Sequence, residues 1–304
     1  MANRVHFPLN KHVYWLLGFL FLSGCSTAST YAVRKPLDVN VIANLPEVLN
    51  ESSGLAIING HVWSHNDSGS RNQIYQLSSN FQTVTKTVTV KRSKNYDWED
   101  FAQSKRYLYI GDTGNNSTRR DGGVIYKVPL ASLEKCSSVT PVSTIRYRFK
   151  DFKPGKTYQH NFDTEAITVV GDQLWLFSKN WQNEHTKLYR LNTTKSNQAV
   201  SPVGDYLTEG LITSADYNAK TSTLALLGYR KDIFLGYSFI WLVKVKDNQL
   251  DWSTAKYKRL RIYSQWEAVH WYKDNKLLIT SEKNPLTKAM IATVDVSSLI
   301  NASE

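Results

Sequence analysis

Three glutamates occupy the same place in three short acidic segments of the sequence. The segments are DWEDFA (97–102), DTEAIT (163–168) and QWEAVH (265–270), and the glutamates are Glu99, Glu165 and Glu267. If each segment begins an equivalent β-strand, the three side chains point to equivalent places and converge. Converging carboxylates repel one another unless a cation or a basic group compensates their charge, and carboxylate oxygens are ligands that Ca²⁺ prefers. One prediction is therefore a Ca²⁺ site formed by these three glutamates.

Basic side chains offer a different compensation. Lys179, Arg230 and Lys283 each follow an apolar stretch downstream of an acidic or polar segment, and a base beside a buried carboxylate can satisfy it without a metal. The fourth candidate segment has Ala215-Asp216 where a glutamate is expected, which interrupts a ring of metal ligands. The sequence therefore slightly favours glutamates paired with bases over a tightly bound cation. The predicted ligand-binding residues are Asp67, Asp112, Lys179, Arg230 and Lys283.

Catalysis at this expected cluster of glutamates and bases would need a general acid or base. The candidates are Glu165, His160 and His65, because carboxyl and imidazole groups are the usual proton carriers in such sites. The sequence has no G-x-S-x-G elbow, no H-E-x-x-H motif and no Cys/His zinc spacing, and these absences argue against a serine hydrolase or a zinc enzyme.

A repeated order of strands must position these residues. Each of five units has a polar head, an apolar strand that ends in a polar cluster, and a third strand. The heads are ESSGLAI (51–57), DWEDFA (97–102), DTEAITV (163–169), SADYNA (214–219) and QWEAVHW (265–271). Units of about 40–50 residues with four strands each are typical of a β-propeller. We therefore expect an all-β protein with five four-stranded blades, and a sixth blade is an alternative because the interval between the second and third heads is long.

The ends of the repeats predict how the ring closes. The last unit leaves no room for a fourth strand, and LDVNVIA (38–44) has no partner before the first unit. We expect this N-terminal strand to complete the last blade, which removes a free sheet edge. In such a ring the start of each first strand and the end of each second strand lie on the same face, so acidic heads and polar tails meet in one central funnel.

Several short motifs resemble a known group of proteins. They are Ser-Gly-Leu-Ala at 53–56, Asn-Asp-Ser-Gly at 66–69, Asp-Thr-Glu-Ala-Ile at 163–167 and Glu-Ala-Val at 267–269. The pattern resembles the extracytoplasmic propellers grouped as SdiA-regulated (YjiK-like) proteins and the phytase-like, esterase-like propellers. The resemblance implies the propeller fold. Two functions stay open: binding of a ligand or partner at the funnel, or metal-assisted hydrolysis of a phosphoester, ester or lactone.

The first 25 residues have the order of an export signal. Basic residues come first, an apolar run VYWLLGFLFL follows at 13–22, and LSGC stands at 22–25. The run is shorter than the ~20 residues that a membrane-spanning helix needs. The tetrapeptide LSGC resembles the lipobox of bacterial lipoproteins, in which the chain is cut before the cysteine and the cysteine receives acyl chains such as palmitate.

This second resemblance implies a division of the chain. Residues 1–24 would be a lipoprotein signal peptide, 25–37 a lipidated tether and 38–304 the propeller domain. Cys25 is the implied lipidation site, and two or more acyl chains anchor a protein stably to a membrane. Ser26 after the cysteine implies the outer membrane, so we expect a lipid-anchored protein of the cell envelope that faces the periplasm.

The charge of the chain bears on its partners. The formal net charge is +11, which suits an anionic surface or ligand. The basic residues form no dense run, so nucleic acid is not an expected partner. The sequence therefore predicts a cell-envelope lipoprotein whose funnel binds an envelope protein, a glycan or an anionic small molecule.

Overall fold

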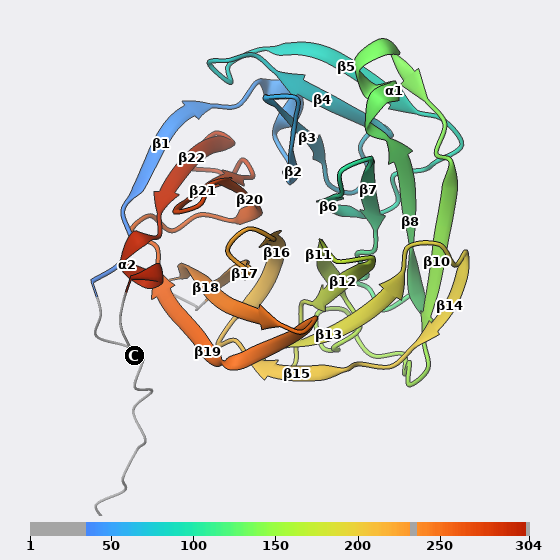
Figure 1. Ribbon diagram of the computed structural model, residues 1–304, viewed down its shortest axis with the longest axis vertical. Helices are drawn as coiled ribbons and strands as arrows, with labels where there is room; N and C mark the ends of the chain where they lie inside the picture. The colour runs from blue at the N-terminus through green and yellow to red at the C-terminus, as the bar shows by residue number, and fades with distance from the viewer. Residues whose placement is uncertain (1–34, 232–235, 302–304) are drawn as a thin grey trace, which may run out of the picture. The chain divides into compact units, whose positions relative to one another are not determined.

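A computed structural model describes residues 35–231 and 236–301. Within these ranges, five β-sheets stand around a common axis and form a five-bladed β-propeller (Figure 1). The innermost strand of each sheet contacts the innermost strands of both neighbouring sheets, so the blades form a continuous ring. The prediction of an all-β, five-bladed propeller is confirmed, and the described residues contain no sixth blade.

Each blade is an antiparallel meander that runs from the axis to the rim. Blade 1 contains β2 (Ser52–Ile58), β3 (His61–Asn66), β4 (Gln73–Leu77) and β5 (Val84–Val90). Blade 2 contains β6 (Trp98–Gln103), β7 (Tyr107–Asp112), β8 (Gly122–Pro129) and β10 (Ser143–Phe149). Blade 3 contains β11 (Thr164–Val170), β12 (Gln173–Ser178), β13 (His185–Asn192) and β15 (Gly204–Leu207). Blade 4 contains β16 (Leu211–Asn218), β17 (Thr223–Arg230), β18 (Tyr237–Lys246) and β19 (Gln249–Arg259).

Blade 5 is completed by a strand from the other end of the described chain. It contains β20 (Trp266–Lys273), β21 (Lys276–Ser281), β22 (Met290–Asp295) and β1 (Val39–Asn44). The outer strand β1 pairs antiparallel with β22, and Val39 lies opposite Val294. The predicted closure by the N-terminal strand is therefore confirmed.

Two blades have more strands than expected. The short strand β9 (Ser138–Val139) pairs parallel with β5 of blade 1, and β14 (Asn197–Val200) pairs parallel with β10 of blade 2. Each added strand comes from the chain of the following blade, which crosses back to cover a sheet edge. The four strands predicted for every blade are present, and these two blades each gain one short strand at the outer edge. The long interval between the second and third heads holds α1 (Leu130–Lys135), β9 and a loop instead of a hidden blade.

Helices contribute little to the described structure. Besides α1 there are a 3-10 turn η1 (Glu47–Leu49) and α2 (Ser297–Ile300). None of the helices within the described residues has the length and apolar character that crossing a bilayer requires. The predicted signal peptide, Cys25 and most of the predicted tether lie outside the described residues.

The core is divided among the gaps between blades. Five buried apolar clusters are present, and each joins two successive blades, including the first and the last. Trp98, Trp175, Trp241 and Trp266 are buried in these clusters. Aromatic side chains bury a large apolar area each, so the gaps contribute much of the stability of the ring.

A buried carboxyl group ties the blades together near the axis. Asp100 Oδ2 accepts hydrogen bonds from the Ile167 backbone N–H of blade 3 and from the Ser214 hydroxyl and Ala215 N–H of blade 4, at 3.1–3.2 Å. The Ser214 oxygen in turn accepts a hydrogen bond from the Val269 N–H of blade 5 at 2.9 Å. Burial raises the pKa of Asp100 well above its ordinary value. Asp100 thus has a structural role rather than a place in the funnel.

Candidate functional site

A β-bulge sits near the start of every innermost strand. In all five blades the pairing of the first and second strands shifts register at this point, and a bulge re-aims the side chain that it carries. The first residue of the bulge in each blade is Ser53, Glu99, Glu165, Thr213 or Glu267, and the bulges of blades 1 and 2 also contain Gly54 and Asp100. The five first residues are all buried. The structure therefore places the three glutamates in one shared position.

A second repeated position lies directly after each second strand. The residues there are Asp67, Thr113, Lys179, Lys231 and Glu282. The sequence predicts Asp67, Lys179, Lys231 and Glu282 among the polar tails of the funnel, but only Asp67 and Lys179 in the ligand-binding set. Thr113 was missed, although it is also the first residue after an apolar strand of a repeat.

The two repeated positions meet in a cavity of about 130 Å³. The lining residues from the bulges are Ser53, Glu99, Glu165 and Glu267, and those after the second strands are Asp67, Lys179, Lys231 and Glu282. Loops and strand ends complete the wall with Asn116, Tyr158, Trp181, Tyr229 and Gln265. The cavity is the predicted funnel, lined by acidic, basic and aromatic side chains.

Acidic groups outnumber basic groups in this cavity. Five carboxyl groups and two lysines line it. Burial and the neighbouring Asp97 raise the pKa of Asp67 to about 7, and burial together with Glu267 raises the pKa of Glu282 to about 9. Burial, then Asp67 and Glu165, raise the pKa of Glu99 well above its ordinary value. Full ionisation of the cavity therefore needs additional positive charge.

One lysine pairs directly with a glutamate. Lys179 Nζ lies 2.8 Å from Glu165 Oε2, and both side chains are buried. Burial alone would lower the pKa of Lys179, but Glu165, Tyr229 and further carboxylates together raise it well above its ordinary value. The ammonium also lies 5.0 Å from the Trp181 ring centroid and 5.4 Å from that of Tyr229. Lys179 is therefore charged and held in place from several sides.

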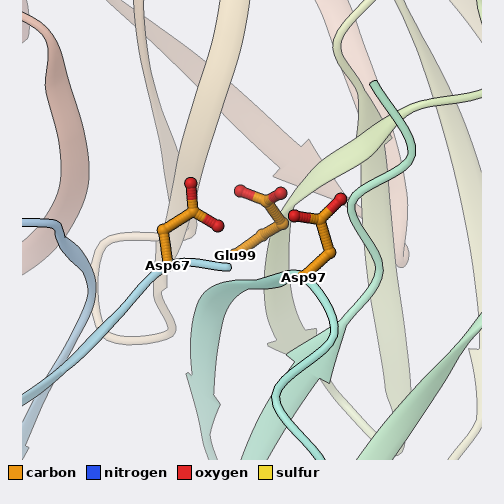
Figure 2. A group of neighbouring side chains, drawn as sticks. All are labelled: Asp67, Asp97 and Glu99. Atoms are coloured by element: carbon orange, nitrogen blue, oxygen red, sulfur yellow. The ribbon is translucent and has the colours of Figure 1, made fainter. Parts of the chain in front are cut away.

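Three carboxylates form a separate cluster at one side of the cavity. Asp67, Asp97 and Glu99 each place an oxygen within 4.8 Å of the others, and Figure 2 shows them side by side. Glu99 Oε1 is buried and has no hydrogen-bond partner. Burial and Asp163 raise the pKa of Asp97 to about 6. Over the part of the chain that the structure describes, no salt bridge joins these three to a base.

A glycine makes room for this cluster. A Cβ atom built on Gly114 would lie 1.9 Å from Glu99 Oε1 and 2.5 Å from Asp97 Oδ2. No real Cβ atom comes this close to an oxygen, so the two carboxylates fill the space that a side chain at position 114 would take. The loop after β7 thereby forms a wall made of backbone against the acidic cluster.

Three of the predicted ligand-binding residues lie away from the cavity lining. Asp112 is buried and accepts a 2.8 Å hydrogen bond from Arg120 Nη1. Arg230 forms a salt bridge with Glu184, 3.1 Å between Nη1 and Oε2. Lys283 is exposed. Of the predicted set, Asp67 and Lys179 line the cavity.

The two histidine candidates are both buried and also lie outside the cavity lining. His65 packs against Phe101, and burial lowers its pKa to about 4. His160 Nε2 lies 3.1 Å from the Asn116 carbonyl, and its Nδ1 accepts a hydrogen bond from the Phe162 N–H. Glu165 is the candidate catalytic residue that the cavity contains.

The fourth repeat differs from its expected alignment. The bulge position of blade 4 holds Thr213, whereas Ala215-Asp216 was predicted to align with the glutamates. Asp216 instead pairs with His270, 3.0 Å between Oδ2 and Nδ1, and both line a hollow of about 1000 Å³ beside the hairpin turns that join first and second strands. The alignment by Asp216 is wrong because an uncharged threonine gives no signal at the bulge.

Comparisons with known proteins address the fold. No family model and no curated protein matches the chain. The catalytic domain of an α-L-arabinofuranosidase from Coprinopsis cinerea is 9% identical, with 86% of this chain and 98% of that one covered and a TM-score of 0.52. A gluconolactonase from Xanthomonas campestris is 10% identical (86% and 95% covered, TM-score 0.42), and hydrazine synthase from Kuenenia stuttgartiensis is 11% identical (89% and 66% covered, TM-score 0.42). At these identities the likeness concerns the fold alone, and the resemblance to SdiA-regulated propellers stays a prediction.

Proposed function

We propose that the propeller binds a ligand with an anionic group in its axial cavity through a divalent cation held by Asp67, Asp97 and Glu99. The observation that carries this proposal is the cluster of three carboxylates within 4.8 Å, with one buried oxygen of Glu99 unpartnered. Such an arrangement is costly without a positive charge between the groups.

The donor set fits a hard cation such as Ca²⁺. All three groups offer carboxylate oxygens, and Ca²⁺ takes six to eight oxygen ligands, so three carboxylates leave positions for a ligand. Lys179 and Lys231 line the same cavity and add positive charge beside those positions. The proposed cation ligands differ from the predicted triad of Glu99, Glu165 and Glu267, because Glu165 is paired with Lys179. Glu99 belongs to both sets.

The lipobox-like LSGC supports a place for this site in the cell envelope. In the proposal, Cys25 carries the lipid anchor and the funnel meets an anionic small molecule, a glycan or an envelope protein. Replacing Cys25 by serine should abolish acylation by labelled palmitate and release the chain from the membrane fraction. Unchanged labelling and fractionation would refute the anchor without affecting the cation site.

Calcium titration by calorimetry tests the cation site. The parent chain should bind one Ca²⁺, and at a hundredfold excess over Kd the bound ion should stabilise the fold by about 2.7 kcal/mol. Asp97→Asn should weaken binding at least about tenfold, since it removes one charged ligand. Asp172→Asn changes an exposed carboxylate at a distant turn and should bind like the parent. Equal affinities for the two variants, or no binding at millimolar Ca²⁺, would refute the proposal.

A metal-assisted hydrolase is the second candidate. The observation in its favour is that the cavity is also lined by carboxyl groups that do not belong to the cation cluster. One of them, Glu165, has a buried Oε1 without a hydrogen-bond partner. Such an oxygen can take a proton from a water molecule. A panel of nitrophenyl esters, nitrophenyl phosphate and simple lactones should then show turnover that EDTA abolishes and Glu165→Gln lowers at least about a hundredfold. No turnover with Ca²⁺ bound would leave the binding role alone.

A further inference from the structure

An arginine-lined groove lies at the rim of blade 2, away from the axial cavity. Its volume is about 840 Å³, and its lining includes Arg119, Arg120, Arg146 and Arg148. Strands β8, β10 and β14 contribute to it, and Figure 1 shows β10 and β14 on the outer side of the ring. The groove is therefore separate from the cation cluster.

The alternation of β10 puts two arginines on its outer face. Residues Ile145, Tyr147 and Phe149 are buried, and Arg146 and Arg148 between them are exposed. Successive strand residues point to opposite faces, so the two guanidinium groups stand on one face about 7 Å apart at their Cα atoms. Arg148 lies opposite Gly122 on β8 and Ala199 on β14. Neither of these neighbours has a long side chain that could cover this arginine.

The charges in the groove are not balanced. Arg120 is paired with Asp112. Within the described residues, the side chains of Arg119, Arg146 and Arg148 have no salt bridge, and Asp121 is the acidic residue in the lining. Three unpaired guanidinium groups and one carboxylate leave two positive charges. A dianion would neutralise them.

We propose that this groove binds a phosphomonoester group. A phosphomonoester carries about −1.5 to −2 charges at pH 7, which matches the charge of the groove. Arginine binds phosphate through two parallel hydrogen bonds, and this geometry gives specificity as well as affinity. The half-buried Phe152 also lines the groove and offers an apolar contact for the organic part of the ester. The source is either a soluble phosphomonoester or a phosphate in a lipid headgroup.

Calorimetry with the full chain in EDTA isolates the groove from the cation cluster. Phenyl phosphate should bind more tightly than inorganic phosphate, because it can also contact Phe152. Arg146→Gln/Arg148→Gln should weaken phenyl phosphate at least about tenfold, since each charged hydrogen bond is lost. Lys246→Gln/Lys273→Gln removes the same charge from exposed sites on blades 4 and 5 and should have little effect. Arg148→Lys keeps the charge but loses the bidentate geometry, and should fall between parent and double variant.

Two further arms complete the test. Benzoate presents one carboxylate to the same groove, and binding as tight as phenyl phosphate would overturn the phosphate assignment. Vesicles of phosphatidylcholine with phosphatidic acid, compared with phosphatidylcholine alone, test the lipid source. Binding to the anionic vesicles that falls in the double arginine variant, with no binding of phenyl phosphate, would assign the site to headgroups. Equal binding of both phosphate probes by parent and double variant, or no binding of either, would refute the proposal.

Discussion

At the scale of single residues, the axial cavity contains more acidic groups than basic groups. Lys179 is the buried base among five carboxyl groups, and its ammonium contacts Glu165 at 2.8 Å. Neutralising the base should therefore lower the stability of the fold by a different amount from neutralising one of the acids. The base interacts with several acids, whereas each acid has few compensating partners.

Two substitutions at the ion pair should therefore differ. Glu165→Gln should lower the free energy of unfolding in EDTA by about 3 kcal/mol, because it breaks a buried pair. Lys179→Met should cost more, because Glu165, Glu267 and Glu99 all lose the positive charge that interacts with them. Urea denaturation of both variants checks the order. A smaller loss for Lys179→Met than for Glu165→Gln would contradict this account of the cavity.

The raised carboxyl pKa values predict the pH dependence of stability. Asp97, Asp67 and Glu282 have pKa values of about 6, 7 and 9 in the fold, whereas unfolded carboxyl groups titrate near about pH 4. The native state thus holds protons that the unfolded state has lost, so stability falls as pH rises from about 4 to 9. Lys179 stays charged throughout this range because its pKa is raised. The cavity lining contains one further base, Lys231.

Thermal unfolding at several pH values measures this effect. In EDTA the melting temperature should fall across the range, and saturating Ca²⁺ should flatten the decline because a bound cation favours the ionised carboxylates. A melting temperature that rises from pH 5 to pH 8 in EDTA would show that other groups dominate.

At the scale of elements, the same backbone feature, a β-bulge, is repeated in every blade with different side chains. Each innermost strand has a bulge near its start, and in four blades a bulge residue lines the axial cavity. In four blades the residue after the second strand lines the same cavity. The scaffold is common to all blades. The site differs from blade to blade because residue type at these positions varies from serine and threonine to glutamate and lysine.

A substitution at Gly114 tests whether the backbone of the loop after β7 shapes the carboxylate cluster. Gly114→Ala should push apart the carboxylates of Glu99 and Asp97, because the ends of these side chains occupy the space that the new methyl group needs. Calcium affinity should fall at least about tenfold as a result. Ser117→Ala in the same loop is the matched control. Unchanged calcium binding by Gly114→Ala would mean that these carboxylates are not cation ligands.

The sequence predicted most of this framework and only part of the site. Acidic and aromatic heads recur at blade spacing, so five blades and the shared position of Glu99, Glu165 and Glu267 could be read directly. Thr213 was missed because a neutral residue gives no repeat signal. Asp97 was expected in an acidic head of the funnel but not as a cation ligand, and Gly114 was not predicted to shape a site, since their position depends on how two loops fold against each other. Strand periodicity says nothing about that contact.

At the scale of the whole described ring, stability is shared among five similar interfaces. Each gap between blades has its own apolar cluster, and the cluster between blades 5 and 1 includes Ala43 of β1. Asp100 adds hydrogen bonds between blades near the axis. The ring therefore depends on all of its gaps, and the last gap also includes a residue of the N-terminal strand β1.

Deleting residues 38–44 tests this dependence. The deletion should expose the edge of β22 and remove its pairing with β1, so we expect aggregation or a fall of more than about 10 °C in melting temperature. Val41→Thr alters an exposed residue of the same strand and should melt like the parent. A deletion variant that melts like the parent would contradict closure by β1.

The pairing of β1 with β22 also sets the timing of folding. The ribosome delivers β1 before any other strand of the ring, and its partner β22 begins at Met290, 246 residues after the end of β1 at Asn44. Until then β1 has no place to dock, although four blades already exist. Contacts so distant in sequence form slowly, and the unpaired edges that wait for them favour aggregation. A chain terminated before residue 290 would contain four complete blades and still be an open arc.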